Sequence, residues 1–167
     1  MKRTIFAAVA AAFLALAATA YAASPIGIVA AENFYGGLAH QLAGPDATVT
    51  SILSNPDQDP HLFEASPSVA RSLAGARIVI YNGADYDPWM DKLLSASPRT
   101  DRQVIVVADL VHKKAGDNPH LWYDPPTMPS VARALAASPT FATRGRQCGR
   151  GLDFGRERPG RSAPQVG

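Results

Sequence analysis

Short apolar runs alternate with helix-forming segments along most of the chain, and this alternation restricts the fold more than any other feature. The apolar runs cover residues 25–31, 76–82 and 103–108, and residues 47–53 form a further predicted strand in which polar and apolar side chains alternate. Short apolar runs are typical of strands buried in a parallel sheet. Between them, apolar residues recur three or four positions apart, which indicates amphipathic helices. The sequence therefore predicts βαβ units and an α/β fold, with a parallel sheet flanked by helices.

The predicted helices begin at recognisable residues. The first covers 33–43, and a later one begins at Thr127 and runs to Ala137. Ser66 and Asp87 each stand directly before a proline. A short polar side chain followed by proline is a common helix start, because the side chain caps the first turn and proline fits the first helical position. We therefore expect Ser66 and Asp87 to be N-caps.

The N-terminus predicts an exported protein. Lys2 and Arg3 precede an apolar run over 4–18, and Ala20-Tyr21-Ala22 has the small-x-small pattern of a cleavage site. We expect residues 1–22 to be a cleaved signal peptide that directs the chain to the periplasm. No cysteine stands at the cleavage point, so a lipoprotein anchor is not predicted. The single cysteine, Cys148, also excludes an intramolecular disulfide and a cysteine-based zinc cluster.

The composition changes after residue 137. Residues 23–137 are predicted to form one α/β domain, whereas 138–167 are rich in arginine and glycine without helical or strand periodicity. The net charge of +2 arises from this basic tail, so it is weak support for nucleic-acid binding, and we expect no nucleic-acid partner. The tail is predicted to be disordered. Its abrupt start also suggests a hypothesis: translation out of frame from Ser138, which sequencing of the gene would test.

Two segments that share a Pro-His-Leu sequence carry the candidate chemistry. His61 lies in Asp59-Pro60-His61-Leu62-Phe63-Glu64, and His120 lies in Asn118-Pro119-His120-Leu121-Trp122-Tyr123-Asp124. Each segment follows a predicted strand. The carboxyl ends of parallel strands meet at one edge of a sheet, where ligands of open α/β sheets bind. We therefore expect the two imidazoles to project from the same edge.

Imidazole is a common ligand of Zn²⁺ and also binds Mn²⁺. Nearby acids can accept a hydrogen bond from the ring nitrogen that does not bind the metal, and Asp59, Glu64 and Asp124 are candidates for this role. A capping or hydrogen-bonded surface histidine is the alternative for each Pro-His pair taken singly. His61 and His120 together favour a metal site.

Four stretches match a known family in order and spacing. They are Val29-Ala30-Ala31-Glu32-Asn33-Phe34-Tyr35, the segment 59–67, Val79-Ile80-Tyr81-Asn82-Gly83-Ala84-Asp85, and Asn118-Pro119-His120-Leu121-Trp122-Tyr123-Asp124-Pro125. Over residues 25–137 the chain resembles the zinc/manganese substrate-binding proteins of ABC importers, the ZnuA/TroA-like family. By resemblance, His61 and His120 are the two metal ligands of the N-terminal lobe.

The resemblance also implies a partner and a departure. Family members have two α/β lobes, carry Zn²⁺ or Mn²⁺ as the transported ion, and deliver it to an inner-membrane ABC permease. The sequence looks like an N-terminal lobe truncated before the lobe that supplies the remaining ligands. We therefore expect a monomer that holds the ion weakly, since Zn²⁺ usually takes three or four protein ligands. Zinc is the first choice, although the sequence leaves manganese open.

The resulting expectation is a binding protein and not an enzyme. The sequence has no His-Glu-x-x-His, no Gly-x-Ser-x-Gly and no phosphate-binding loop. Two alternatives stay open at this point. One is an exported adhesin-like or structural protein, and the other is a secreted zinc-dependent hydrolase.

Overall fold

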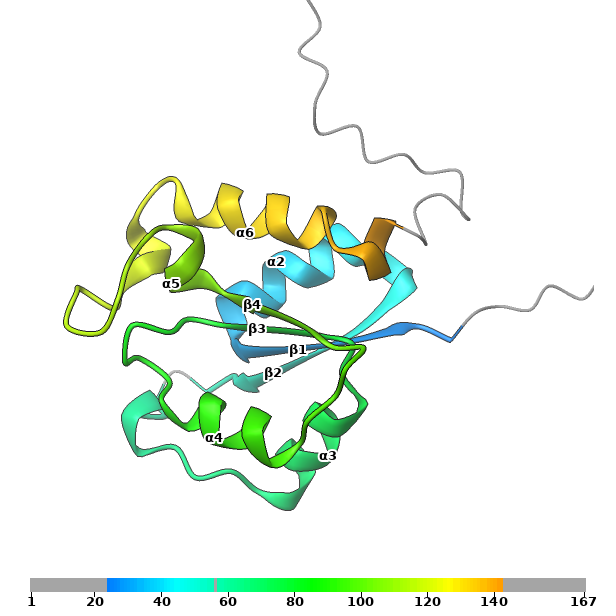
Figure 1. Cartoon of the computed structure of the whole chain (residues 1–167), viewed down its shortest axis with the longest axis horizontal. Coiled ribbons are helices and arrows are strands. Elements are labelled where there is room, and N and C mark those ends of the chain that lie inside the picture. The colour runs from blue at the N-terminus through cyan, green and yellow to red at the C-terminus, as the bar shows by residue number, and fades with distance from the viewer. Residues whose placement is uncertain (1–23, 56, 143–167) are drawn as a thin grey trace, which may run out of the picture.

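The computed structural model describes residues 24–55 and 57–142 (Figure 1). The predicted signal peptide, residues 1–22, lies outside the described residues, as does the predicted tail from residue 143 on. Among the described residues, every helix falls short of the length and hydrophobicity needed to cross a membrane. The elements are β1 (Ile26–Glu32), α2 (Asn33–Ala43), β2 (Ala47–Leu53), α3 (Pro67–Gly75), β3 (Ile78–Tyr81), α4 (Trp89–Ala96), β4 (Gln103–Val106), α5 (Val107–Leu110) and α6 (Thr127–Ala136).

The four strands form one parallel sheet in the order β2-β1-β3-β4. Figure 1 shows α2, α5 and α6 on one face of this sheet and α3 and α4 on the other. The predicted α/β fold with a parallel sheet flanked by helices is therefore confirmed.

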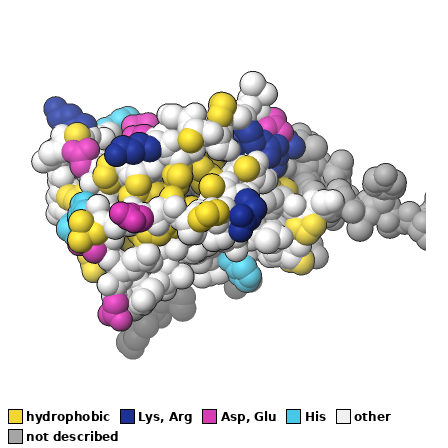
Figure 2. Space-filling view, turned by 90° about the horizontal axis from the view of Figure 1, so that it is seen from below, with side chains coloured by type: hydrophobic (Ala, Val, Ile, Leu, Met, Phe, Trp, Pro, Cys, Tyr) yellow, Lys and Arg dark blue, Asp and Glu magenta, His cyan; other side chains and the backbone are white. Residues whose placement is uncertain are grey.

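Both faces of the sheet are buried, which explains why its central strands are apolar except for Glu32 at the end of β1. In β1, Ile28 and Ala30 pack into the core beneath α2 and α6. Val29 and Ala31 point the other way, into the core shared with α3 and α4. Successive side chains of a strand lie on opposite faces, so a strand covered on both sides needs apolar residues at every position. The α3–α4 side also shows outer apolar side chains interspersed with charged ones (Figure 2).

Two local predictions differ from the structure. The strand predicted to reach residue 108 ends at Val106 and continues as α5. Asp87 was predicted to cap a helix, but α4 has Pro88 at its N-cap without a side-chain cap. The Asp87 carboxylate instead accepts hydrogen bonds from the backbone N–H groups of Asn82 and Gly83, at 2.7 and 2.8 Å. This contact spans the turn after β3, which a local helix-start pattern does not reveal. Ser66 does cap α3, accepting from Val69 N at 3.4 Å.

The folded domain extends beyond the predicted boundary at residue 137. Ser138 is fully buried, and Phe141 packs into the core that contains Leu135 of α6. Residues 139–142 form a further helical turn. The five residues from 138 to 142 therefore belong to the domain, because Phe141 supplies apolar surface that the basic composition of the following residues concealed.

The strand order places a topological switch point at the carboxyl edge of the sheet. From β1 the chain continues to β2, which lies next to β1 at one edge of the sheet. From β3 it continues to β4, which lies next to β3 at the opposite edge. Loops that follow neighbouring strands on the two sides of such a switch point diverge, and ligands of open α/β sheets bind there. In this sheet the switch point lies between β1 and β3.

Candidate metal site

Each Pro-His segment contains a one-turn 3-10 helix. His61 lies in a one-turn 3-10 helix, Pro60–Leu62, and His120 directly precedes another, Leu121–Tyr123. In each segment the side chain two residues before the histidine accepts a hydrogen bond from the histidine backbone N–H. Asp59 Oδ1 accepts from His61 N at 2.8 Å, and Asn118 Oδ1 accepts from His120 N at 3.0 Å. The same contact, from the side chain two residues earlier to the histidine N–H, therefore holds the backbone of both histidines.

Both histidines lie against one tyrosine. The ring centroid of Tyr86 is 5.8 Å from that of His61 and 6.0 Å from that of His120, and both pairs meet edge to face. Trp122 packs against His120 and Tyr86 at 5.3 and 5.0 Å. His61 follows β2 and His120 follows β4, the two outer strands. The two histidine loops thus approach the switch point from the two outer strands of the sheet. Tyr86 belongs to the connection between β3 and α4 and contacts both histidines.

His120 has a defined ring orientation. Its Nδ1 lies 2.9 Å from Asn118 Oδ1, and an amide oxygen can only accept, so Nδ1 carries the proton. That tautomer leaves Nε2 with a free lone pair for a metal ion. The sequence prediction missed Asn118, although its position two residues before the histidine, matching Asp59, was a visible signal.

The three acids predicted to lie behind the histidines differ in their contacts. Asp59 contacts the backbone of His61 rather than its ring. Glu64 and Asp124 are both exposed, and among the described residues neither carboxylate forms a hydrogen bond with an imidazole. The side chain that contacts an imidazole nitrogen is the amide of Asn118, at His120.

The remaining histidines lie elsewhere. His40 is exposed on α2, and His112 is exposed with a left-handed backbone, φ 56°. Within residues 24–55 and 57–142, no cluster of three or more His, Cys, Asp or Glu side chains is arranged to hold a metal ion. His61 and His120 thus offer two nitrogens, half of a tetrahedral zinc shell. Both are exposed, as are the adjacent Leu62 and Tyr123, each 78% exposed.

A buried carboxyl pair lies beneath the site. Glu32, at the end of β1, is 2% exposed, and Asp87 is 1% exposed. Burial raises the pKa of Glu32 well above its ordinary value, and the neighbouring Asp87 raises it further. Neither Glu32 oxygen has a hydrogen-bond partner among the described residues, whereas the Asp87 carboxylate accepts from two backbone N–H groups. A hollow of about 150 Å³ lies beside this pair and is lined in part by Glu32, Pro60 and Tyr86.

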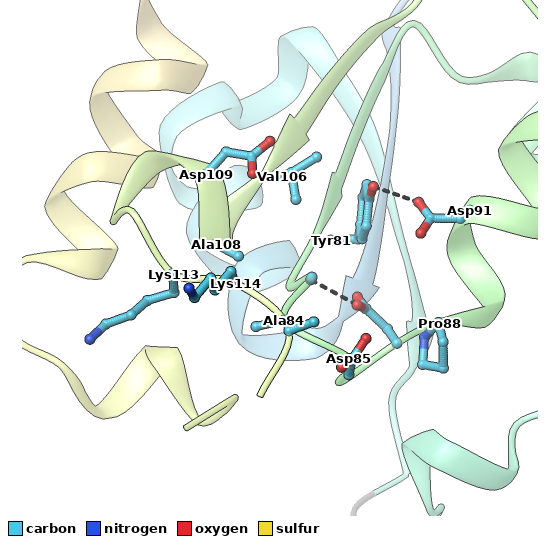
Figure 3. Close-up of a pocket in the computed structure, with 13 residues that line it drawn as sticks. Tyr81, Ala84, Asp85, Pro88, Asp91, Val106, Ala108, Asp109, Lys113 and Lys114 are labelled. Atoms are coloured by element: carbon cyan, nitrogen blue, oxygen red, sulfur yellow. Dashed lines mark hydrogen bonds between the residues drawn. The ribbon is translucent and has the colours of Figure 1, made fainter. Parts of the chain in front are cut away.

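A larger hollow of about 290 Å³ lies beside the ends of β3 and β4, and neither metal-site histidine lines it. Its walls carry four aspartates and two lysines, which are Asp85, Asp87, Asp91, Asp109, Lys113 and Lys114 (Figure 3). Figure 3 shows Lys113 extending away from it, while Asp91 accepts a hydrogen bond from Tyr81 at 2.7 Å. Mixed charge and existing hydrogen bonds make this hollow a poorer cation site than the histidine edge.

Comparison with known proteins identifies the family of the chain. Residues 28–140 match the family described as the periplasmic component A of the zinc-uptake complex. The chain belongs to this family. It is 33% identical, over 100 residues, to a protein of Thermotoga maritima whose name describes it as metal-binding. It is 30% identical, over 96 residues, to the manganese-binding lipoprotein MntA of Bacillus subtilis. These matches cover 59% and 53% of this chain.

The solved structure of the periplasmic zinc-binding protein TroA from Treponema pallidum has the same fold, with a TM-score of 0.58 at 21% identity. That match covers 75% of this chain and 50% of TroA. The chain spans about a third of the two curated relatives, 34% and 31%. The fold and the family are thus shown over the histidine-bearing domain.

Proposed function

We propose that this chain binds Zn²⁺ or Mn²⁺ in the periplasm as the substrate-binding component of an ABC importer and passes the ion to an inner-membrane permease. His61 and His120 are the proposed ligands. The observation that carries the proposal is their convergence on Tyr86 from opposite sides of the sheet switch point. Family membership and the names of the relatives, which include zinc-binding and manganese-binding proteins, support the same conclusion.

The exposure of both imidazoles favours a protein that carries the ion and releases it over a metal-storage protein. An ion held at an exposed edge can enter and leave without the domain unfolding. Zinc is preferred over manganese, because neutral imidazole binds Zn²⁺ more tightly than Mn²⁺. With two ligands from the described residues, we expect a dissociation constant of about micromolar or weaker, since high-affinity zinc sites take three or four protein ligands.

Competition against a chromophoric chelator tests the binding step. We expect one Zn²⁺ per chain, and weaker binding by about tenfold or more when His61→Ala or His120→Ala removes a ligand. His40→Ala is the matched control, because His40 is also an exposed histidine but lies on α2. Unchanged affinity in either ligand variant, or an equal loss in His40→Ala, would contradict the assignment.

A growth experiment tests the transport step. Deletion of the gene should reduce growth in medium depleted of divalent metals by a chelator, and added zinc should restore it. Restoration by manganese alone would identify manganese as the transported ion. Normal growth and normal cellular metal content after deletion would argue for the adhesin-like alternative. Zinc-dependent hydrolysis by the purified chain would argue for the hydrolase.

A further inference from the structure

One short segment contacts the backbone of both histidine loops. The indole Nε1 of Trp89 donates a hydrogen bond to the carbonyl oxygen of Pro60 at 2.9 Å. The amide Nδ2 of Asn82 donates to the carbonyl oxygen of Pro119, also at 2.9 Å. Each acceptor is the residue directly before a histidine. Asn82 and Trp89 stand at the two ends of the connection from β3 to α4, the connection that also carries Tyr86.

Asn82 is held in a single orientation. It is fully buried, and Tyr35 Oη donates to its Oδ1 at 2.7 Å. Its Nδ2 donates to the carbonyls of Gly83 and Pro119, both at 2.9 Å. Asp87 accepts from its backbone N–H. Two carbonyl acceptors on one side and a hydroxyl on the other determine which atom is nitrogen. The donor to Pro119 is therefore fixed by its surroundings.

Trp89 is held by packing. Its ring is 8% exposed and lies 4.3 Å from the ring of Phe63, centroid to centroid. The indole has one donor, and that donor contacts Pro60. Trp89 is separated from Pro60 by 29 residues, and Asn82 from Pro119 by 37. These two hydrogen bonds thus connect the loops that follow the two outer strands to the single connection between β3 and α4.

We propose that Asn82 and Trp89 are positioning residues for the metal site. Each fixes the residue before one histidine and so sets where that imidazole lies around Tyr86. Loss of either donor releases one loop and leaves a backbone carbonyl without its partner. The effect on metal affinity rests on the proposed function, whereas the effect on the imidazoles is independent of any metal.

Two substitutions separate the two loops. Trp89→Phe removes the Nε1 donor while retaining an aromatic ring against Phe63. Asn82→Ala removes the donor to Pro119. Tyr81→Phe is the matched control, because it deletes a 2.7 Å hydrogen bond to Asp91 on α4 without touching either histidine loop (Figure 3). If Asn82→Ala does not fold, Tyr35→Phe tests the same loop by removing the bond that orients the Asn82 amide.

Nitrogen NMR of the imidazoles in the metal-free full chain is the first measurement, and zinc affinity by chelator competition is the second. We expect Trp89→Phe to shift the His61 ring signals and Asn82→Ala to shift those of His120. Each should weaken Zn²⁺ binding about tenfold, the size of effect seen when residues behind metal ligands are changed. Tyr81→Phe should lower thermal stability while leaving the ring signals and the affinity unchanged.

The outcomes are distinguishable. The inference is overturned if the ring signals and the zinc affinity stay unchanged in Trp89→Phe and in Asn82→Ala, or in Tyr35→Phe where that variant replaces Asn82→Ala. It is also overturned if Tyr81→Phe changes them equally. If the unsubstituted chain binds no zinc while the ring signals move as expected, the proposed function fails and the positioning of the two loops stands.

Discussion

Asp59 and Asn118 hold the same place relative to their histidines but contact different groups. Asp59 accepts one hydrogen bond, from the backbone of His61. Asn118 accepts from both the backbone and the ring of His120. The amide therefore sets the turn and the tautomer together. The two imidazoles are consequently not equivalent, since only that of His120 has its Nδ1 proton bound within the chain among the described residues.

At the scale of single residues, Glu32 should make the stability of the domain depend on pH. Its pKa is raised in the folded state by burial and by Asp87, so the folded chain keeps a proton that the unfolded chain releases. Stability is then fully present below the ordinary pKa of 4.5 and falls as pH rises toward the folded value. Glu32→Gln retains the size of the side chain and removes the ionisable group. We expect it to raise the free energy of unfolding at pH 8 by about 1–2 kcal/mol.

Urea unfolding of both forms at pH 5 and pH 8 provides the measurement. The unsubstituted chain should lose stability between the two pH values, and Glu32→Gln should lose less. Parallel pH dependence in the two forms would mean that Glu32 titrates normally in the folded state.

At the scale of elements, two adjacent glycines of α2 should respond oppositely to alanine. A Cβ at Gly36 would collide with Ser51 Oγ on β2 and lie 3.3 Å from Ser51 Cβ, whereas a Cβ at Gly37 meets nothing within 4 Å. Gly36→Ala should destabilise the domain by about 1–3 kcal/mol, because α2 must move away from the sheet. Gly37→Ala should stabilise it by about 0.5–1 kcal/mol through helix propensity.

Chemical denaturation of the two variants gives the comparison, and a third variant tests the cause. Combining Gly36→Ala with Ser51→Ala removes the colliding hydroxyl and should recover part of the loss. Equal effects of the two glycine substitutions would mean that helix propensity alone is being measured.

At the scale of the whole molecule, Phe141 marks where the folded domain extends. It is 9% exposed and packs with Leu135 in the core beneath α2 and α6. Phe141→Ala should reduce the free energy of unfolding by about 2–3 kcal/mol, a value below that of a central phenylalanine because this site lies near the edge of the domain. Leu62→Ala is the control, since Leu62 is 78% exposed and its loss should change stability by about 0.5 kcal/mol or less. Similar small effects at both positions would place the end of the domain before residue 138.

Most of the fold was predictable because periodicity is a local property. Strands such as β2 and helices such as α2 agree with the predicted ranges to the residue. The shared edge of His61 and His120 also followed from the parallel sheet. The order of the strands in the sheet could not be predicted, because it depends on pairing between residues far apart in the sequence. Knowledge of that order explains why loops from the two outer strands converge.

The supporting residues of the site escaped prediction for a different reason. Nothing in the local sequence around Trp89 or Asn82 points to a role at the site. Their hydrogen bonds reach across 29 and 37 residues and leave no pattern in the local sequence. Asp87 was misread as a helix cap, because its true partners lie on the turn before it. Side-chain roles at the site therefore required the three-dimensional arrangement.

The turn after β3 has a thermodynamic consequence for the ion. Gly83, Ala84 and Asp85 are three successive residues with left-handed backbones, at φ 73°, 51° and 62°. A side chain at Gly83 would lie 2.8 Å from a Val106 methyl group, so the turn is tightly confined. Such conformations persist only where their surroundings fix them. The conformational entropy of this connection is thus lost when the domain folds, and a metal ion arriving at the finished site spends little of its binding free energy on ordering the chain.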